Sequence, residues 1–152
     1  MIEPIELVDL PARHLAAVKA RAGRDQLGAT IMRSLDKVYA LLRGRGVTGL
    51  GHNVVVYRDP ARGMPFELEI GVETPAPIVP EGEVEAITLP AARAAVVAYW
   101  GPYDKMIEGH AAMQAWLAER GLKARDNVEV YGDHDDDPAK LRTDLVYILV
   151  HA

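Results

Sequence analysis

Two kinds of hydrophobic pattern alternate along the chain. Residues 66–72 (FELEIGV) alternate apolar and polar positions, as in a strand with one buried face. Residues 27–42 place apolar side chains three and four apart, which is typical of an amphipathic helix. Residues 106–117 repeat the helical spacing, and residues 141–150 repeat the strand-like pattern. The chain is therefore predicted to be an α+β protein.

Shorter apolar segments complete each half of the chain. Residues 15–21 and 94–100 are rich in Ala and Val, and each fits a partly buried strand ahead of a helix. Residues 52–57 (HNVVVY) and 127–131 (NVEVY) predict a strand after each helix, and both end near turn-forming residues. Each half is thus predicted to run strand–helix–strand–strand.

The two halves also share short sequence signals. The tripeptide Leu-Pro-Ala occurs at residues 10–12 and again at 89–91, and both helical patterns end on Arg-Gly. Three prolines fall within residues 74–83 and indicate a stiff connection. We predict a single domain of two modules, with module one at 1–74, a linker at 75–83 and module two at 84–152. Two such units would share one sheet, with helices on one side and an open face on the other. The alternative is one α+β domain in which the repeated Leu-Pro-Ala tripeptide is a coincidence.

Composition and charge narrow the possible functions. The net charge is -5, which argues against a nucleic-acid partner, and the absence of cysteine excludes disulfides and thiolate sites. The first ten residues do not resemble a signal peptide. No stretch approaches the ~20 apolar residues of a membrane span. We expect a cytoplasmic protein without membrane contact. No phosphate-cradling glycine loop is present, and no cofactor is expected.

A series of motifs in the second half resembles a known family. Gly101-Pro102-Tyr103 follows a strand, Trp116-Leu117 lies in the next helix, and Val130-Tyr131 and Thr143-Asp144-Leu145 follow. Their order is similar to that of the GyrI-like small-molecule-binding family, which includes effector-binding domains of bacterial multidrug-responsive transcription regulators. The resemblance extends from Ile2 to Val150.

The resemblance implies a largely antiparallel sheet with helices on one face and pseudo-twofold symmetry. A ligand cleft would lie between the modules, lined by aromatic residues and holding a buried acid. The late acidic residue is most often Glu in the family but is Asp144 here, and LVYILV lacks the proline common after it. No helix-turn-helix pattern precedes the repeat, so direct DNA binding is not expected.

Two acidic residues are the first candidates for the site. Alternation places Glu69 and Asp144 opposite the apolar face of their strands, and we expect both to point into the open face between the modules. A carboxylate in an apolar, aromatic-lined cup would attract a cation. The alternative is that both lie on a solvated sheet face.

Aromatic and sulfur-containing side chains complete the candidate site. The resemblance implies that Trp100 and Tyr103 form a pocket wall, and Met106 is expected near the pocket mouth. Tyr57 and Tyr131 end equivalent strands, where each would either offer a hydroxyl to the cleft or cap the core.

Metal and acyl-enzyme chemistry are not expected. Residues 132–138 (GDHDDDP) have the alternate spacing of a calcium loop, but Pro138 stands where such a loop needs Gly. The five histidines show no paired ligand spacing, and His110 is expected to be a satisfied buried or boundary histidine. The single serine, Ser34, lies within a helix.

Three functions follow from these features. The first is a stand-alone protein that binds an aromatic, cationic or amphipathic small molecule. The alternative is a hydrolase of strained electrophilic toxins of the cyclopropanoid type, in which Glu69 or Asp144 activates water and a tyrosine polarises the leaving oxygen. The second alternative is a DNA gyrase-interacting or inhibitory protein. The sequence sets no oligomeric state.

Overall fold

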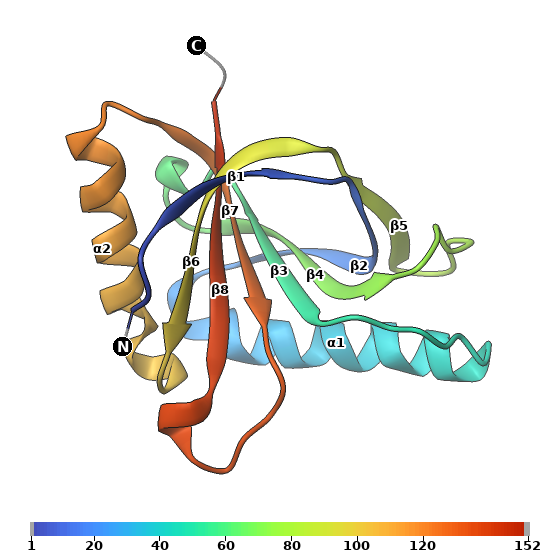
Figure 1. The fold of residues 1–152 in the computed structure, drawn as a ribbon. Coiled ribbons are helices and arrows are strands. Elements are labelled where there is room, and N and C mark those ends of the chain that lie inside the picture. The colour runs from blue at the N-terminus through green and yellow to red at the C-terminus, as the bar shows by residue number, and fades with distance from the viewer. Residues whose placement is uncertain (1, 151–152) are drawn as a thin grey trace.

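The computed structural model describes residues 2–150 as two α-helices and one eight-stranded sheet (Figure 1). In chain order the elements are β1 (Glu6–Leu10), β2 (Arg13–Ala22), α1 (Leu27–Gly44), β3 (Asn53–Arg58), β4 (Phe66–Thr74), β5 (Val84–Leu89), β6 (Ala92–Trp100), α2 (Met106–Glu119), β7 (Ala124–Tyr131) and β8 (Arg142–Leu149). Short 3-10 turns occupy Arg24–Gln26, Pro60–Arg62, Tyr103–Lys105 and Pro138–Lys140. Within residues 2–150, neither helix has the length and hydropathy needed to span a bilayer.

The predicted α+β class and the antiparallel sheet are confirmed. Both helices and six of the strands lie where their patterns indicate, and all strand pairs are antiparallel. The sequence analysis did not identify β1 and β5, the two edge strands of the sheet. Most of their side chains are at least partly exposed, so neither strand carries a strong apolar alternation.

The strand order is the same from either end of the sheet. It runs β1-β6-β8-β7-β3-β4-β2-β5. The counterparts in the two halves are β1 and β5, β2 and β6, β3 and β7, and β4 and β8. Exchanging each strand for its counterpart gives the same order read from the other end of the sheet. The edge strands are exchanged between the halves, since β1 pairs with β6 and β5 pairs with β2. This order is what a duplicated module would give, while the module boundaries at 1–74 and 84–152 stay a prediction.

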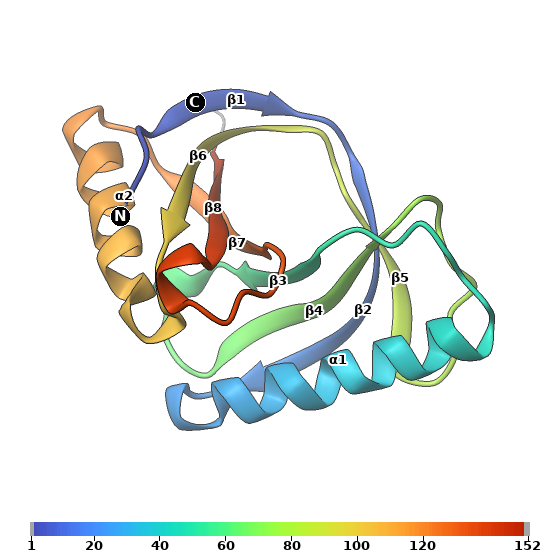
Figure 2. The same ribbon diagram turned by 60° about the horizontal axis from the view of Figure 1, so that its bottom comes forward.

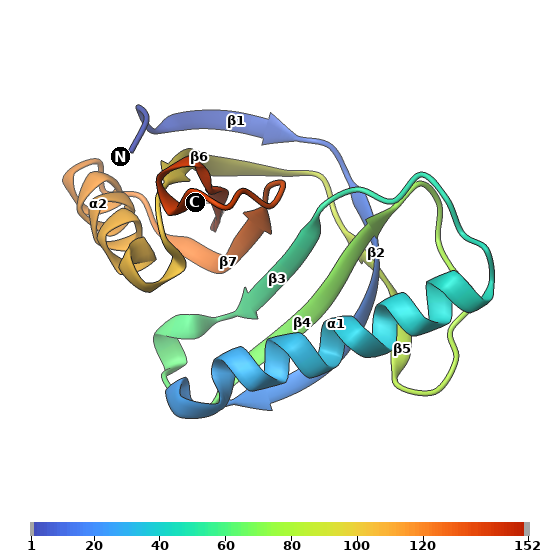
Figure 3. The same cartoon turned by 90° about the horizontal axis from the view of Figure 1, so that it is seen from below.

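Both helices pack on the same face of the sheet. Helix α1 covers β2 and β4, and α2 covers β6 and β8. Val55 of the α1 side lies opposite Glu129, which lies opposite Leu145 of the α2 side, and residues directly opposite one another share a face. Strands β3 and β7 therefore run along the floor between the helices (Figure 3).

The other face of the sheet is not an open cleft. The sheet is strongly curved (Figure 2), and a buried apolar cluster fills its inner side. This cluster includes Leu15, Val54, Ala94, Val128 and Val146, against which side chains from the edge strands pack. The face that the sequence analysis expected to be open is therefore filled by apolar side chains.

Candidate functional site

A cavity of about 1020 Å³ lies between the two helices, above the central strands. It is slightly larger than the roughly 300–1,000 Å³ typical of small-molecule sites. Its walls come from the start of α1, from α2 and from the loop between β3 and β4. Its floor is formed by Tyr57, Glu129, Tyr131 and Tyr147. The cavity thus lies between the two halves of the sheet, as the family resemblance implied, but on the helix-bearing face.

The floor is organised around one buried carboxylate, Glu129, which is 6% exposed. Its Oε1 accepts hydrogen bonds from the hydroxyls of Tyr131 at 2.5 Å and Tyr57 at 3.2 Å. Its Oε2 lies 2.8 Å from Nε2 of His110. Among residues 2–150, His110 is its only ion-pair partner, and no lysine or arginine pairs with it. Within the described chain, the side-chain partners of this buried acid are thus two phenols and one imidazole.

His110 extends this network across the cavity wall. Its Nδ1 lies 2.6 Å from the hydroxyl of Tyr147. When Nε2 carries the proton and donates to Glu129, Nδ1 accepts from Tyr147, so that all three groups are satisfied. The histidine is hydrogen-bonded as its place on the helix indicated, and it also lines the cavity.

The tyrosine hydroxyls stay protonated donors at neutral pH. Burial, reinforced by the charge of Glu129, raises the pKa of both Tyr131 and Tyr57 well above the ordinary value. Burial likewise raises the pKa of Tyr147 to about 12. The hydroxyls of Tyr57 and Tyr131 therefore hold the Glu129 carboxylate as neutral hydrogen-bond donors, while that of Tyr147 bonds His110.

Four of the seven predicted site residues lie together at this cavity: Tyr57, Tyr103, Met106 and Tyr131. Tyr103 packs edge-on against Tyr131, with ring centroids 5.7 Å apart, and is 50% exposed at the mouth. Met106 is buried on the α2 side. Of the two residues expected to form the aromatic wall, Tyr103 therefore lines the cavity and Trp100 does not.

The other three predicted residues lie on the opposite face of the sheet, away from the cavity. Glu69 accepts from Arg58 at 2.6 Å, and Asp144 accepts from Arg142 at 2.8 Å. The Arg142 guanidinium stacks 5.5 Å from the centre of the Trp100 ring. Alternation placed Glu69 and Asp144 on the correct side of their strands. They nevertheless lie away from the cavity, because the cavity is on the face of the sheet that carries the helices.

Sequence reasoning missed Glu129, although a signal for it is present. An offset of 74 aligns HNVVVY (52–57) with DNVEVY (126–131), which differ at the first position and at Val55/Glu129. The structure pairs Asn53 with Tyr131 and Tyr57 with Asn127, so Val55 and Glu129 face each other at the centre of the sheet. The signal that could have drawn attention to Glu129 is an acid at the position where the first half of the chain has valine.

The described residues give no indication of a metal centre. Within residues 2–150, no group of three or more His, Asp or Glu side chains could hold a metal ion. The Asp135 and Asp137 side chains of the acidic loop instead accept from backbone N–H groups of the same loop. His151 lies outside the described residues.

Several solved structures share this fold. The EcmrR C-terminal domain superposes with a TM-score of 0.79 at 16% identity, with 98% of each chain covered. An EcmrR chain in a complex with DNA gives the same score, and this chain covers 58% of its length. SAV2435 bound to tetraphenylphosphonium gives 0.66 at 13% identity, covering 97% of this chain and 94% of that one. A hydrolase encoded by lin2189 from Listeria innocua gives 0.60 at 12%, covering 96% and 91%.

Identities this low establish a common fold and nothing further. A comparison with curated proteins found no match. The family is established by a sequence model, that of the GyrI-like small molecule binding domain, which matches residues 3–150. The chain therefore belongs to the GyrI-like small-molecule-binding family, the family that its Gly-Pro-Tyr and later motifs resembled.

Proposed function

We propose that this chain binds an aromatic organic cation, or an amphipathic molecule with a cationic group, in the cavity between α1 and α2. The observation that supports this most directly is the Glu129 carboxylate, buried at the floor and held only by phenols and a histidine. A cation placed above it would form a charge pair that no arginine or lysine of the described chain forms within ion-pair distance, although Arg24 and Arg125 also line the cavity.

The cavity walls suit the rest of such a ligand. Aromatic rings of Tyr103 and Tyr131 stand at right angles beside the acid, and each ring face offers a cation about 0.5–2 kcal/mol. Met64 and Ile107 leave apolar surface exposed at the mouth. The ligand-bound neighbour SAV2435 holds tetraphenylphosphonium, a bulky aromatic cation, on the same fold.

The test compares a cation with an uncharged molecule of similar shape. Tetraphenylphosphonium and triphenylphosphine oxide are titrated calorimetrically into the wild type and into Glu129→Gln. The substitution keeps the shape and removes the charge, so cation affinity should fall by about 1.5–3 kcal/mol while binding of the neutral compound barely changes.

Asp144→Asn provides the matched control. It removes a carboxylate that lies on the opposite face in a half-exposed pair with Arg142. Its cation affinity should equal that of the wild type. Equal affinity in Glu129→Gln, or an equal loss in Asp144→Asn, would contradict the assignment.

A second candidate function is hydrolysis of a strained electrophile, favoured by the chain of hydrogen bonds from Tyr147 through His110 to Glu129. The Glu129 carboxylate would take a proton from water as the water oxygen attacks the strained carbon. As the ring bond breaks, a tyrosine hydroxyl would protonate the leaving atom, and the proton on Glu129 would then restore the phenol.

The same variant separates the two candidates. If the chain is a hydrolase, Glu129→Gln should retain substrate binding while turnover falls by roughly 100-fold or more, the scale for loss of a general base. Product formation from a cyclopropane-bearing electrophile is followed by chromatography. Substrate that stays intact with the wild type would eliminate this candidate and leave binding.

A further inference from the structure

The loop between β3 and β4 forms one side of the cavity mouth. Pro60, Ala61, Gly63 and Met64 all line the cavity, and Met64 remains 56% exposed there. The loop contains only a short 3-10 turn, Pro60–Arg62. Its position therefore depends on how its first residues are anchored.

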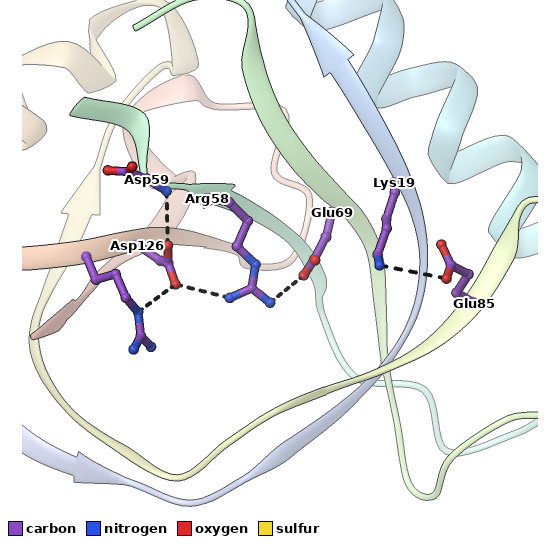
Figure 4. A network of polar contacts seen from close by, with 7 residues as sticks. Lys19, Arg58, Asp59, Glu69, Glu85 and Asp126 are labelled. Atoms are coloured by element: carbon purple, nitrogen blue, oxygen red, sulfur yellow. Dashed lines mark hydrogen bonds and ion pairs between the residues drawn. The ribbon is translucent and has the colours of Figure 1, made fainter. Parts of the chain in front are cut away.

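The anchor lies on the opposite face of the sheet, at Asp126 of β7 (Figure 4). Asp126 is 5% exposed, and its Oδ1 accepts the backbone N–H of Asp59 at 3.0 Å. Its Oδ2 accepts from Nη1 of Arg58 and from Nε of Arg125, each at 3.1 Å. One buried carboxylate thus holds the end of β3 and the first residue of the loop.

Glu69 completes the network. Arg58 donates through Nη2 to Oε1 of Glu69 at 2.6 Å while its Nη1 donates to Asp126. Figure 4 shows the guanidinium between the two carboxylates, which come from β4 and β7. The ion pairs therefore bridge three adjacent strands, and two strands of one half of the sheet are tied to one strand of the other.

Asp59 adopts a backbone conformation that needs such an anchor. Within residues 2–150 it is the only non-glycine residue with positive φ, at 45°. Its side chain pairs with Arg62 at 3.3 Å, and Arg62 also contacts Glu67 at 3.3 Å. Without the hydrogen bond from its N–H to Asp126, Asp59 would relax to negative φ, and the loop would move with it.

We propose that Asp126 is a positioning residue that fixes residues 59–65 as a wall of the cavity mouth and so sets how tightly the site binds a cation large enough to contact that wall. The choice of a cation as ligand rests on the proposed function, whereas the role of Asp126 as the anchor of the loop does not. Glu69, which the sequence suggested as a ligand contact, acts through Arg58.

The first test compares a bulky cation with a small one. We expect tetraphenylphosphonium to reach from the region above Glu129 to the loop, whereas the smaller tetramethylammonium should need only that region. In Asp126→Ala the affinity for tetraphenylphosphonium should fall about tenfold or more, the scale of one lost charge-assisted contact, while tetramethylammonium changes by less than about twofold. Asp126→Asn keeps an oxygen acceptor for the Asp59 N–H and should therefore retain most of the tetraphenylphosphonium affinity that Asp126→Ala loses.

A second measurement requires no ligand. Hydrogen exchange of the amides in residues 59–65 should speed up in Asp126→Ala, less in Glu69→Gln, and little in Asp126→Asn. Asp144→Asn, which breaks an ion pair elsewhere on the same face, should leave both the exchange and the affinity ratio unchanged. If Asp126→Ala does not fold, Glu69→Gln and Asp126→Asn still give the graded series.

The outcomes separate the two proposals. A wild type that binds neither cation contradicts the proposed function, and the exchange of residues 59–65 then decides the anchor alone. Unchanged exchange in Asp126→Ala, or an equal loss of affinity for both cations, overturns the positioning role. A lower melting temperature with an unchanged affinity ratio overturns it as well, because Asp126 would then only stabilise the fold.

Discussion

At the scale of single residues, the buried phenols link the site to stability at alkaline pH. The pKa of Tyr147 is raised to about 12 by burial, above its ordinary value of 10.0. Between these pH values the folded chain keeps a proton that the unfolded chain loses. The stabilisation is therefore complete below pH 10 and is lost as the pH rises toward 12. Burial raises the pKa of Tyr57 and Tyr131 in the same direction.

Denaturant unfolding measured from pH 8 to 11.5 should show this loss as a falling free energy of unfolding. Tyr147→Phe should reduce the slope of unfolding free energy against pH, because it removes one of the shifted groups. A slope in Tyr147→Phe equal to that of the wild type would contradict the raised pKa of Tyr147.

Some residues of the candidate site could be predicted from the sequence, and others could not. Tyr57 and Tyr131 were identified because equivalent strands end on them, and Tyr103 because of its motif. Glu69 and Glu129 are both buried acids on central strands, and alternation alone cannot rank them. Which face holds the cavity depends on the curvature of the whole sheet, so the choice between them is a long-range property.

At the scale of elements, one glycine permits the close approach of β2 and β4. A Cβ at Gly71 would lie 1.8 Å from the carbonyl oxygen of Ala16 and 2.7 Å from the Cα of Ala17. Gly71→Ala must therefore push the two strands apart, and it should cost at least roughly 1–3 kcal/mol of unfolding free energy, the usual range for overpacking.

Gly44→Ala is the contrasting change, because nothing lies within 4 Å of a Cβ at this last residue of α1. It should be neutral or stabilise the chain by up to about 1 kcal/mol through helix propensity. The urea midpoints of the two variants and the wild type measure these changes in unfolding free energy. A Gly71→Ala midpoint equal to that of the wild type would mean that β2 and β4 can separate without cost.

Elements were predicted best where one face is buried. The helices and central strands were found from their periods because a packed core enforces the pattern. The edge strands β1 and β5 escaped detection because their side chains are partly exposed on both faces. The two Leu-Pro-Ala segments nevertheless marked where these strands lead into β2 and β6, in corresponding connections of the sheet.

At the scale of the whole molecule, the strand order is symmetric but the residues that line the cavity are not. Val55 faces Glu129 at the centre of the sheet, and His110 and Tyr147 of the second half complete the polar network. The first half supplies Tyr57 and the loop that walls the mouth. Binding should therefore require both halves, although most polar groups come from one of them.

The exchange of edge strands predicts that neither half folds alone. A cut within residues 75–83 would leave β1 without β6, β5 without β2, and β3 without β7. Fragments 1–79 and 80–152, prepared separately, should each lack a cooperative thermal transition by circular dichroism. The mixture should regain it and should bind tetraphenylphosphonium, since the Tyr57 hydroxyl of one fragment donates to Glu129 of the other. The uncut chain and a chain cleaved after folding serve as controls. A native-like transition in either fragment alone would show two independent domains and contradict the single shared sheet.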